Sequence, residues 1–179
     1  MGIPTLIATL TASADATLAD TSSMTSTYDE YMFVLTQMHP ATDSVDFGFQ
    51  VNVDGASGYN ETITNTFFYA AQDEAASYPG MAYSTSMDQA QGTAYSWISL
   101  NTGNDNDQSM SGILHIFTPA STTYVTHFYS RCGHVHAGDY MHDTFSAGYI
   151  NATGAITDIS FKFDSGNIDA GVIQIYGIS

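Results

Sequence analysis

Residues 45–53 carry the strictest pattern in this 179-residue chain, an alternation of apolar and non-apolar side chains. Val45, Phe47, Phe49, Val51 and Val53 are apolar, and the residues between them are not. A period of two matches a β-strand, in which successive side chains point to opposite faces, and it does not match the 3.6-residue period of an α-helix. The segment therefore predicts a strand with one buried face and one face in water.

A second extended segment, residues 28–38, comes just before it and is rich in aromatic residues. Its alternation is less regular, so we expect both of its faces to be covered. Residues 39–44 join the two segments and combine Pro40, whose φ is fixed, with small polar residues that form local backbone hydrogen bonds. The pair predicts either a β-hairpin or the corner of a β-sandwich.

Strand-like segments separated by turn signals continue along the rest of the chain, and residues 133–143 between two of them are expected to form a histidine-rich loop. Roughly nine to eleven strands at this spacing predict an all-β fold, an antiparallel, jelly-roll-like β-sandwich. Residues 1–179 are expected to form a single domain, with residues 1–27 as an N-terminal strand and arm. The other expected strands are residues 5–11, 61–70, 95–100, 113–118, 122–132, 144–150, 156–163 and 170–178.

The charge of the chain excludes two classes of partner. Eighteen acidic residues face only two cations, Arg131 and Lys162, which gives a formal net charge of −16. Such a chain has too few cations to neutralise phosphates, so we expect it to bind no nucleic acid, and anionic membranes would repel it. Cys132 is the single cysteine, so no disulfide can form within the chain.

The sharpest candidate for chemistry lies in residues 131–143. His134, His136, His142 and Asp139 offer the imidazole and carboxylate ligands that Zn²⁺ and related ions accept. The alternative, a polar loop or subunit contact, is favoured because the spacing matches no closed structural zinc site.

Two further classes of site have weaker sequence support. Residues 104–107, Asn-Asp-Asn-Asp, are rich in the oxygen ligands of Ca²⁺, but they lack the full EF-hand pattern, so a solvated hairpin loop is the favoured interpretation. The sequence contains no P-loop, no dinucleotide fingerprint and no Gly-x-Ser-x-Gly elbow. We therefore expect no cofactor and no enzymatic activity.

Both ends and the first third of the chain resemble a β-sandwich module of tailed-bacteriophage virion proteins, which occurs in decoration, tail and fibre components. The resemblance is carried by residues 4–7 (PTLI), 11–18 (TASADATL), 28–31 (YDEY), 39–43 (HPATD) and 165–178. These motifs are structural and carry no chemistry of their own.

The resemblance implies a structural protein located in the virion, and the capsid decoration role is favoured. In that role the protein would bind other virion proteins, the major capsid or tail protein, and would itself be a homo-oligomer, with a trimer favoured. The alternatives are a tail or fibre module that binds a host receptor or glycan and, with less support, a polysaccharide hydrolase.

Overall fold

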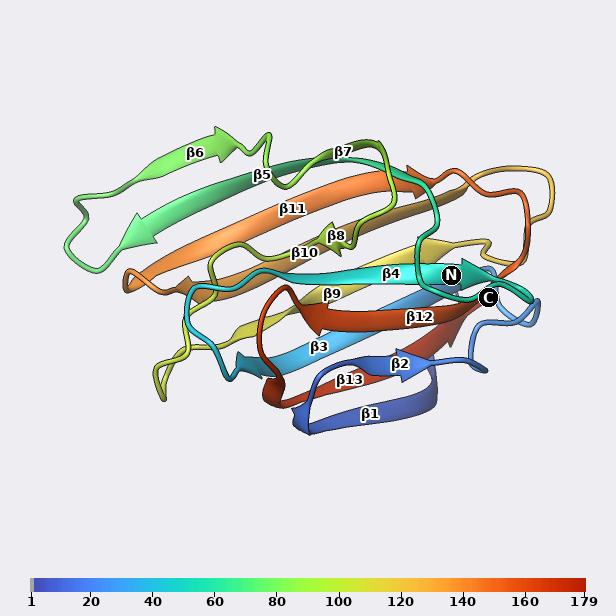
Figure 1. Cartoon of the computed structure of the whole chain (residues 1–179), viewed down its shortest axis with the longest axis horizontal. Helices are drawn as coiled ribbons and strands as arrows, with labels where there is room; N and C mark the ends of the chain where they lie inside the picture. The colour runs from blue at the N-terminus through green and yellow to red at the C-terminus, as the bar shows by residue number, and fades with distance from the viewer. Residues whose placement is uncertain (1) are drawn as a thin grey trace.

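The computed structural model describes residues 2–179, which form thirteen β-strands and no helix (Figure 1). All strand pairings are antiparallel, and the strands are divided between a nine-stranded and a four-stranded sheet. The predicted antiparallel β-sandwich is therefore confirmed. The strand count exceeds the prediction because two strands, Gly80–Tyr83 and Gln89–Gly92, have only four residues each, too few to show a periodic pattern. In this range no helix is long and apolar enough to cross a membrane.

The nine-stranded sheet forms one layer of the sandwich. Its ninth strand, β7 (Gln89–Gly92), pairs with β5 beside the main path. The other eight strands follow one another in the order β1 (Thr5–Asp15), β13 (Ile168–Ile178), β3 (Glu30–Pro40), β9 (Met110–Phe117), β10 (Thr126–His136), β11 (Tyr140–Ile150), β5 (Ile63–Asp73) and β6 (Gly80–Tyr83).

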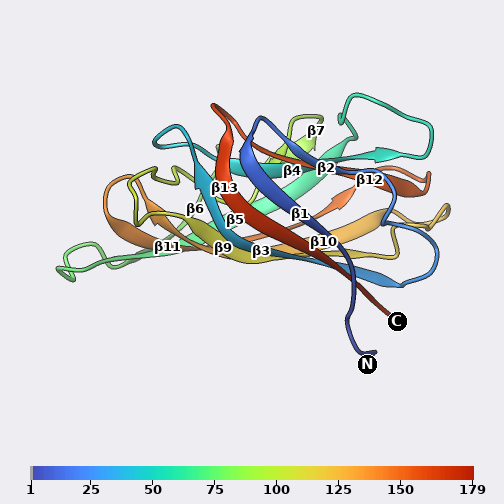
Figure 2. The ribbon, with the colours of Figure 1, turned by 90° about the horizontal axis from the view of Figure 1, so that it is seen from below.

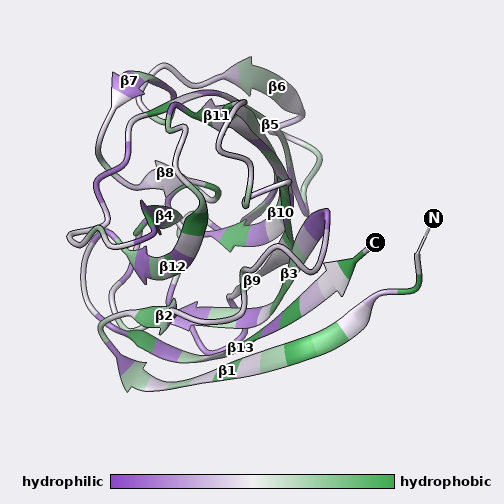
Figure 3. Ribbon diagram, turned by 90° about the vertical axis from the view of Figure 1, so that its right-hand side faces the viewer, coloured by the Kyte–Doolittle hydropathy of each residue, from purple (hydrophilic) through white to green (hydrophobic). Residues whose placement is uncertain are grey.

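The smaller sheet covers one face of the larger one. Its order is β2 (Leu18–Asp20), β12 (Ile156–Phe163), β4 (Phe47–Val53) and β8 (Ser96–Trp97). Figure 3 shows the large sheet curving around the small one, with β2, β12, β4 and β8 on its inner side. The two faces of the large sheet are called here the inner face, which is covered by the small sheet, and the outer face.

Aromatic side chains from both sheets form the centre of the core. The rings of Phe47 and Phe161, on neighbouring strands of the small sheet, stack with centres 6.1 Å apart. Phe49 reaches across the sandwich to Phe128 on β10, with ring centres 5.0 Å apart and planes at 84°. Rings in such edge-to-face contact stabilise a core beyond the area they bury.

Residues 28–53 form a corner of the sandwich and not a hairpin. β3 lies in the large sheet between β13 and β9, whereas β4 lies in the small sheet between β12 and β8. The link between them carries the chain from one layer to the other, where β4 pairs with strands far from it in sequence. Of the two predicted alternatives, the structure therefore selects the sandwich corner.

The predicted exposure of these two strands was wrong. Gln50 and Asn52 on the supposedly wet face of β4 are buried, because residues 59–61 and 93–97 cover that face. Conversely, Met32 and Val34 on β3 are half-exposed on the outer face, although both faces of this segment were expected to be covered.

The N-terminal segment is built into both sheets. β1 is the edge strand of the large sheet and pairs with β13, and β2 is the edge strand of the small sheet and pairs with β12. Because β1 and β13 are antiparallel, the two chain ends lie side by side, as Figure 2 shows, and the backbone of Gly2 lies against Ser179.

Candidate functional site

The hairpin of β10 and β11 brings the predicted histidines together. The two strands pair residue by residue, so that His134 lies directly opposite His142 and His136 opposite Tyr140. All three histidines occupy alternate positions that point to the inner face, because successive side chains of a strand alternate. The prediction of a loop over residues 133–143 was wrong, since both strands continue into this segment and leave only residues 137–139 as a turn.

The three imidazole rings form a cluster under the large sheet. The ring centres of His134 and His142 are 5.2 Å apart with the planes at 89°, and those of His136 and His142 are 5.0 Å apart. Tyr69 and Tyr140 flank the cluster, with ring centres 4.5 and 5.1 Å from that of His142. His134 is 1% exposed and His142 is 3% exposed, whereas His136 and the two tyrosines are half-buried, so the cluster lies at the edge of the core.

Hydrogen bonds fix the protons of two of the rings. Nε2 of His134 lies 2.7 Å from the carbonyl oxygen of Leu100, which accepts, so this nitrogen carries the proton of the neutral ring. Nδ1 of His136 accepts from the backbone N–H of Gly138 at 2.9 Å, which leaves Nε2 to donate to the hydroxyl of Tyr140 at 3.1 Å. Within residues 2–179, Nδ1 of His134 and both ring nitrogens of His142 have no hydrogen-bond partner.

The surroundings keep the cluster uncharged. Burial, and next the neighbouring ring of His142, lower the pKa of His134 to about 3. Burial, and next His136, lower the pKa of His142 to about 4, and burial also lowers the pKa of His136. At neutral pH all three side chains are therefore neutral imidazoles, the form in which histidine binds metal ions.

Asp139 lies apart from the three rings. It occupies the hairpin turn with a φ of +60°, and its Oδ1 accepts a hydrogen bond from Nε2 of the buried Gln108 at 2.9 Å. The structure thus brings together three of the four predicted ligands. In the part of the chain that is described, no three His, Cys, Asp or Glu side chains form a preformed metal-binding group.

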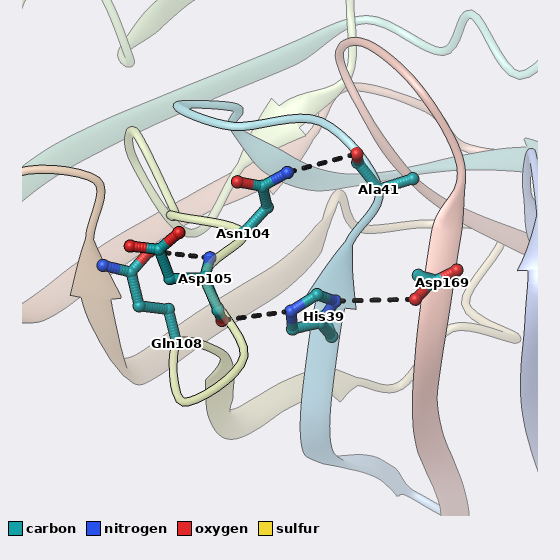
Figure 4. A network of polar contacts seen from close by, with 6 residues as sticks. All are labelled: His39, Ala41, Asn104, Asp105, Gln108 and Asp169. Carbon is teal, nitrogen blue, oxygen red and sulfur yellow. Dashed lines mark hydrogen bonds and ion pairs between the residues drawn. The ribbon is translucent and has the colours of Figure 1, made fainter.

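The acidic loop at residues 104–107 is fastened to neighbouring strands by protein groups (Figure 4). The carbonyl oxygen of Asp105 lies 3.3 Å from Nε2 of His39 on β3, and Nδ1 of His39 lies 3.8 Å from the carboxylate of Asp169 on β13. The side-chain amide of Asn104 donates to the carbonyl of Ala41 at 3.3 Å, and the N–H of Asp105 donates to Oε1 of Gln108 at 3.2 Å. These contacts anchor the loop beside the histidine hairpin.

The outer face of the large sheet is a second candidate site, because aromatic and apolar side chains gather on it. Phe68 on β5 and Phe145 on β11 stack with ring centres 4.9 Å apart. Tyr129 on β10 stacks on His115 at 4.6 Å and lies 5.7 Å from Phe117, both on β9. Phe68 and Tyr129 are 39% and 44% exposed, so these rings form an accessible surface.

This face carries few charges, in contrast to the rest of the chain. Among the outward positions of β3, β9, β10, β11 and β5, only Glu30 and Asp143 carry carboxylates. Glu30 hydrogen-bonds to Nδ1 of His115. Asp143 accepts two hydrogen bonds from Arg131, from Nη2 at 2.8 Å and from Nε at 3.1 Å, and the guanidinium also lies 5.1 Å from the ring centre of Phe145. The other acidic residues lie in loops or elsewhere on the strands.

A shallow hollow lies in the middle of the outer face. Gly133 has no side chain to fill it, and Ile113, Tyr129, Arg131 and Met141 stand around it. Sequence reasoning missed this whole surface, because its residues come from five segments whose register is set by strand pairing. The available signal was the recurrence of aromatic residues at alternate positions, such as Phe145 and Tyr149, in strands whose other positions are buried.

No family model matches this sequence, and no curated protein sequence matches it. Among solved structures, the fold has a distant likeness to a structural-genomics protein of unknown function from Bacteroides ovatus. The TM-score is 0.31 at 6% sequence identity, and the match covers 59% of this chain and 45% of that one. A likeness of this size carries no argument about fold or function.

Proposed function

We propose that this protein is a structural component of a tailed-phage virion, a capsid decoration protein that binds the shell through the outer face of its nine-stranded sheet. The observation that carries the proposal is the aromatic character of that face, with few charges on it, on a chain with a net charge of −16. The resemblance of both chain ends to virion modules supports it independently.

The role in this proposal is mechanical and not enzymatic. Burial of apolar surface stabilises a contact by roughly 25 cal/mol per Å², and aromatic residues are enriched at such contacts. Glu30 and Asp143 already have hydrogen-bonding partners in His115 and Arg131, so a neighbour would bury this face without leaving a carboxylate unsatisfied. The remaining acidic surface would face outward and keep bound copies from associating at random.

Binding to the particle tests this function. In Tyr129→Asp, a charge replaces an exposed ring at the centre of the outer face, and in Tyr124→Asp the same change falls on a 76% exposed residue of the loop between β9 and β10. We expect Tyr129→Asp to keep a native circular dichroism spectrum but to lose binding to particles that lack the protein. Tyr124→Asp should bind like the wild type. Equal binding by both variants would contradict the proposal.

The resemblance also favours a homo-oligomer, specifically a trimer. Native mass spectrometry at an ionic strength of about 0.15 M, where surface repulsion is screened within about 8 Å, is the measurement for this part. A species of three chains is expected. A monomer over the whole accessible concentration range would contradict the trimer. The proposal that the outer face binds the shell would then be tested by the particle-binding experiment alone.

The hollow on the outer face favours a second function, the recognition of a glycan by a tail or fibre module. An exposed ring such as Tyr129 offers a flat apolar surface to a sugar, and the paired Arg131 and Asp143 offer charged hydrogen-bonding groups beside it. A glycan array should then give hits that are lost in Arg131→Ala. An array without hits would leave the decoration role as the only function that this face supports.

A further inference from the structure

The histidine cluster leaves buried nitrogen atoms without partners, and the outer-face function does not explain them. His134 Nδ1, His142 Nδ1 and His142 Nε2 are all inaccessible to solvent. A buried polar group without a hydrogen bond destabilises the fold, so native proteins keep such groups rarely and usually for a ligand, an ion or a water molecule.

The proton positions show what kind of ligand these atoms suit. Because the Leu100 carbonyl holds the proton of His134 on Nε2, the buried Nδ1 atom of this ring carries a lone pair that no protein donor uses. A backbone carbonyl that fixes the far nitrogen of a ring is the usual support of a metal-binding histidine. His142 has neither nitrogen engaged, so either of them is free to bind an ion.

The spacing of two of the three ring pairs suits a shared ion as well. A zinc–nitrogen bond is about 2.0–2.1 Å long, which places the centres of two imidazoles on one tetrahedral ion about 5 Å apart. The centres of His134 and His142 are 5.2 Å apart, and those of His136 and His142 are 5.0 Å apart. The third ring is engaged, since Nε2 of His136 contacts the hydroxyl of Tyr140.

We propose that this cluster binds one transition-metal ion of the zinc class, with His134 Nδ1 and His142 as the first ligands and His136 as the third. His136 joins when its proton moves from Nε2 to Nδ1, which ends the hydrogen bond that Nδ1 accepts from Gly138, and Nε2 then exchanges its contact with the Tyr140 hydroxyl for the ion. A water molecule takes the fourth position. Imidazole ligands select zinc, copper or nickel over calcium and magnesium. Asp139 stays with Gln108 and takes no part.

Zinc binding to the purified full chain, first freed of metal with a chelator, tests this proposal. We expect one Zn²⁺ per chain after dialysis, a higher unfolding temperature with Zn²⁺, and a tetrahedral absorption spectrum with Co²⁺. His142→Phe should bind at least about tenfold more weakly, whereas His127→Phe, a matched change at an exposed outer-face histidine, should bind like the wild type. Zinc content below a tenth of an ion per chain, or equal binding by the two variants, would overturn the proposal.

A measurement on the wild type covers the case in which His142→Phe does not fold. Nitrogen-15 NMR of the histidine side chains reports which ring nitrogen gains a ligand. We expect Zn²⁺ to shift Nδ1 of His134, one nitrogen of His142 and Nε2 of His136, and to leave His39 and His127 unchanged. Shifts confined to His39 or His127 would show surface binding only and would overturn the proposal.

Discussion

His134 and His142 are buried opposite each other in the β10–β11 hairpin, with perpendicular rings whose centres are 5.2 Å apart. Both are held in the neutral form, since burial lowers the pKa of His134 to about 3 and that of His142 to about 4. In the unfolded chain both would titrate near 6.5.

This difference in pKa predicts that the metal-free protein becomes less stable as the pH is lowered. Between pH 6.5 and 4 the unfolded state binds more protons than the folded state, so the stabilisation is complete above pH 6.5 and is lost as the pH falls. Between pH 7 and pH 5 we expect a loss of about 2 kcal/mol from His134 and a smaller loss from His142. Urea unfolding at a series of pH values, with a chelator present, measures this loss of stability. His142→Phe should flatten the profile and His127→Phe should not, and a flat wild-type profile would contradict the prediction.

Cys132 is predicted to be unreactive in the folded protein. It is fully buried on the inner face of β10, and burial raises the pKa of its thiol to about 12. Because the thiolate is the reactive form, a thiol reagent at pH 8 should label almost no native protein and one cysteine per chain in denaturant. Labelling of the native protein at the denatured rate would mean that the β10 inner face is open.

Two glycines on neighbouring strands should respond differently to alanine. A Cβ on Gly112 would lie 2.5 Å from Sγ of Cys132 and 2.6 Å from the Arg131 carbonyl oxygen, so Gly112→Ala should cost about 1–3 kcal/mol of unfolding free energy. On the outer face, a Cβ on Gly133 would meet only the mobile end of Met141 at 2.7 Å, and Gly133→Ala should cost little. Urea unfolding of the two variants compares their free energies of unfolding. Equal losses would contradict the close packing of Gly112 against Cys132.

Gln50 is predicted to be a structural residue of β4. Its Nε2 donates to the carbonyls of Glu61 at 2.8 Å, Ala94 at 3.2 Å and Thr93 at 3.3 Å. Gln50→Met keeps most of the volume but leaves these acceptors without that donor, so we expect a loss of about 1–3 kcal/mol in urea unfolding. The same change at Gln72, which is exposed on β5, should be within about 0.5 kcal/mol of the wild type. A neutral Gln50→Met would show that β4 has a solvated face after all.

Gln50 also shows what the sequence alone does not predict, namely the exposure of a strand. The alternation of residues 45–53 correctly predicts a strand, because the period of two depends only on backbone geometry. It cannot reveal that distant segments, residues 59–61 and 93–97, fold over the polar side of that strand and satisfy Gln50 and Asn52. Local pattern determines the type of element, and long-range contacts determine its exposure.

The candidate sites show the same difference between local and long-range contacts. Three of the four predicted ligands come together because His134, His136 and His142 are close in sequence and share one face of a hairpin. Asp139 differs because the turn and Gln108, about thirty residues earlier in the chain, decide where its carboxylate points. The outer face was not predictable, since its stacked pairs, such as Phe68 with Phe145, join residues far apart in the chain.

The most direct test of the central proposal is a reconstruction of the virion that carries this protein. We predict that the chain lies on the capsid at regular positions, in copy numbers that match the shell protein, with the outer face of β9, β10 and β11 against its neighbour. A chain found only at the tail, or on the capsid with Tyr129 and Phe145 facing solvent, would contradict the proposal.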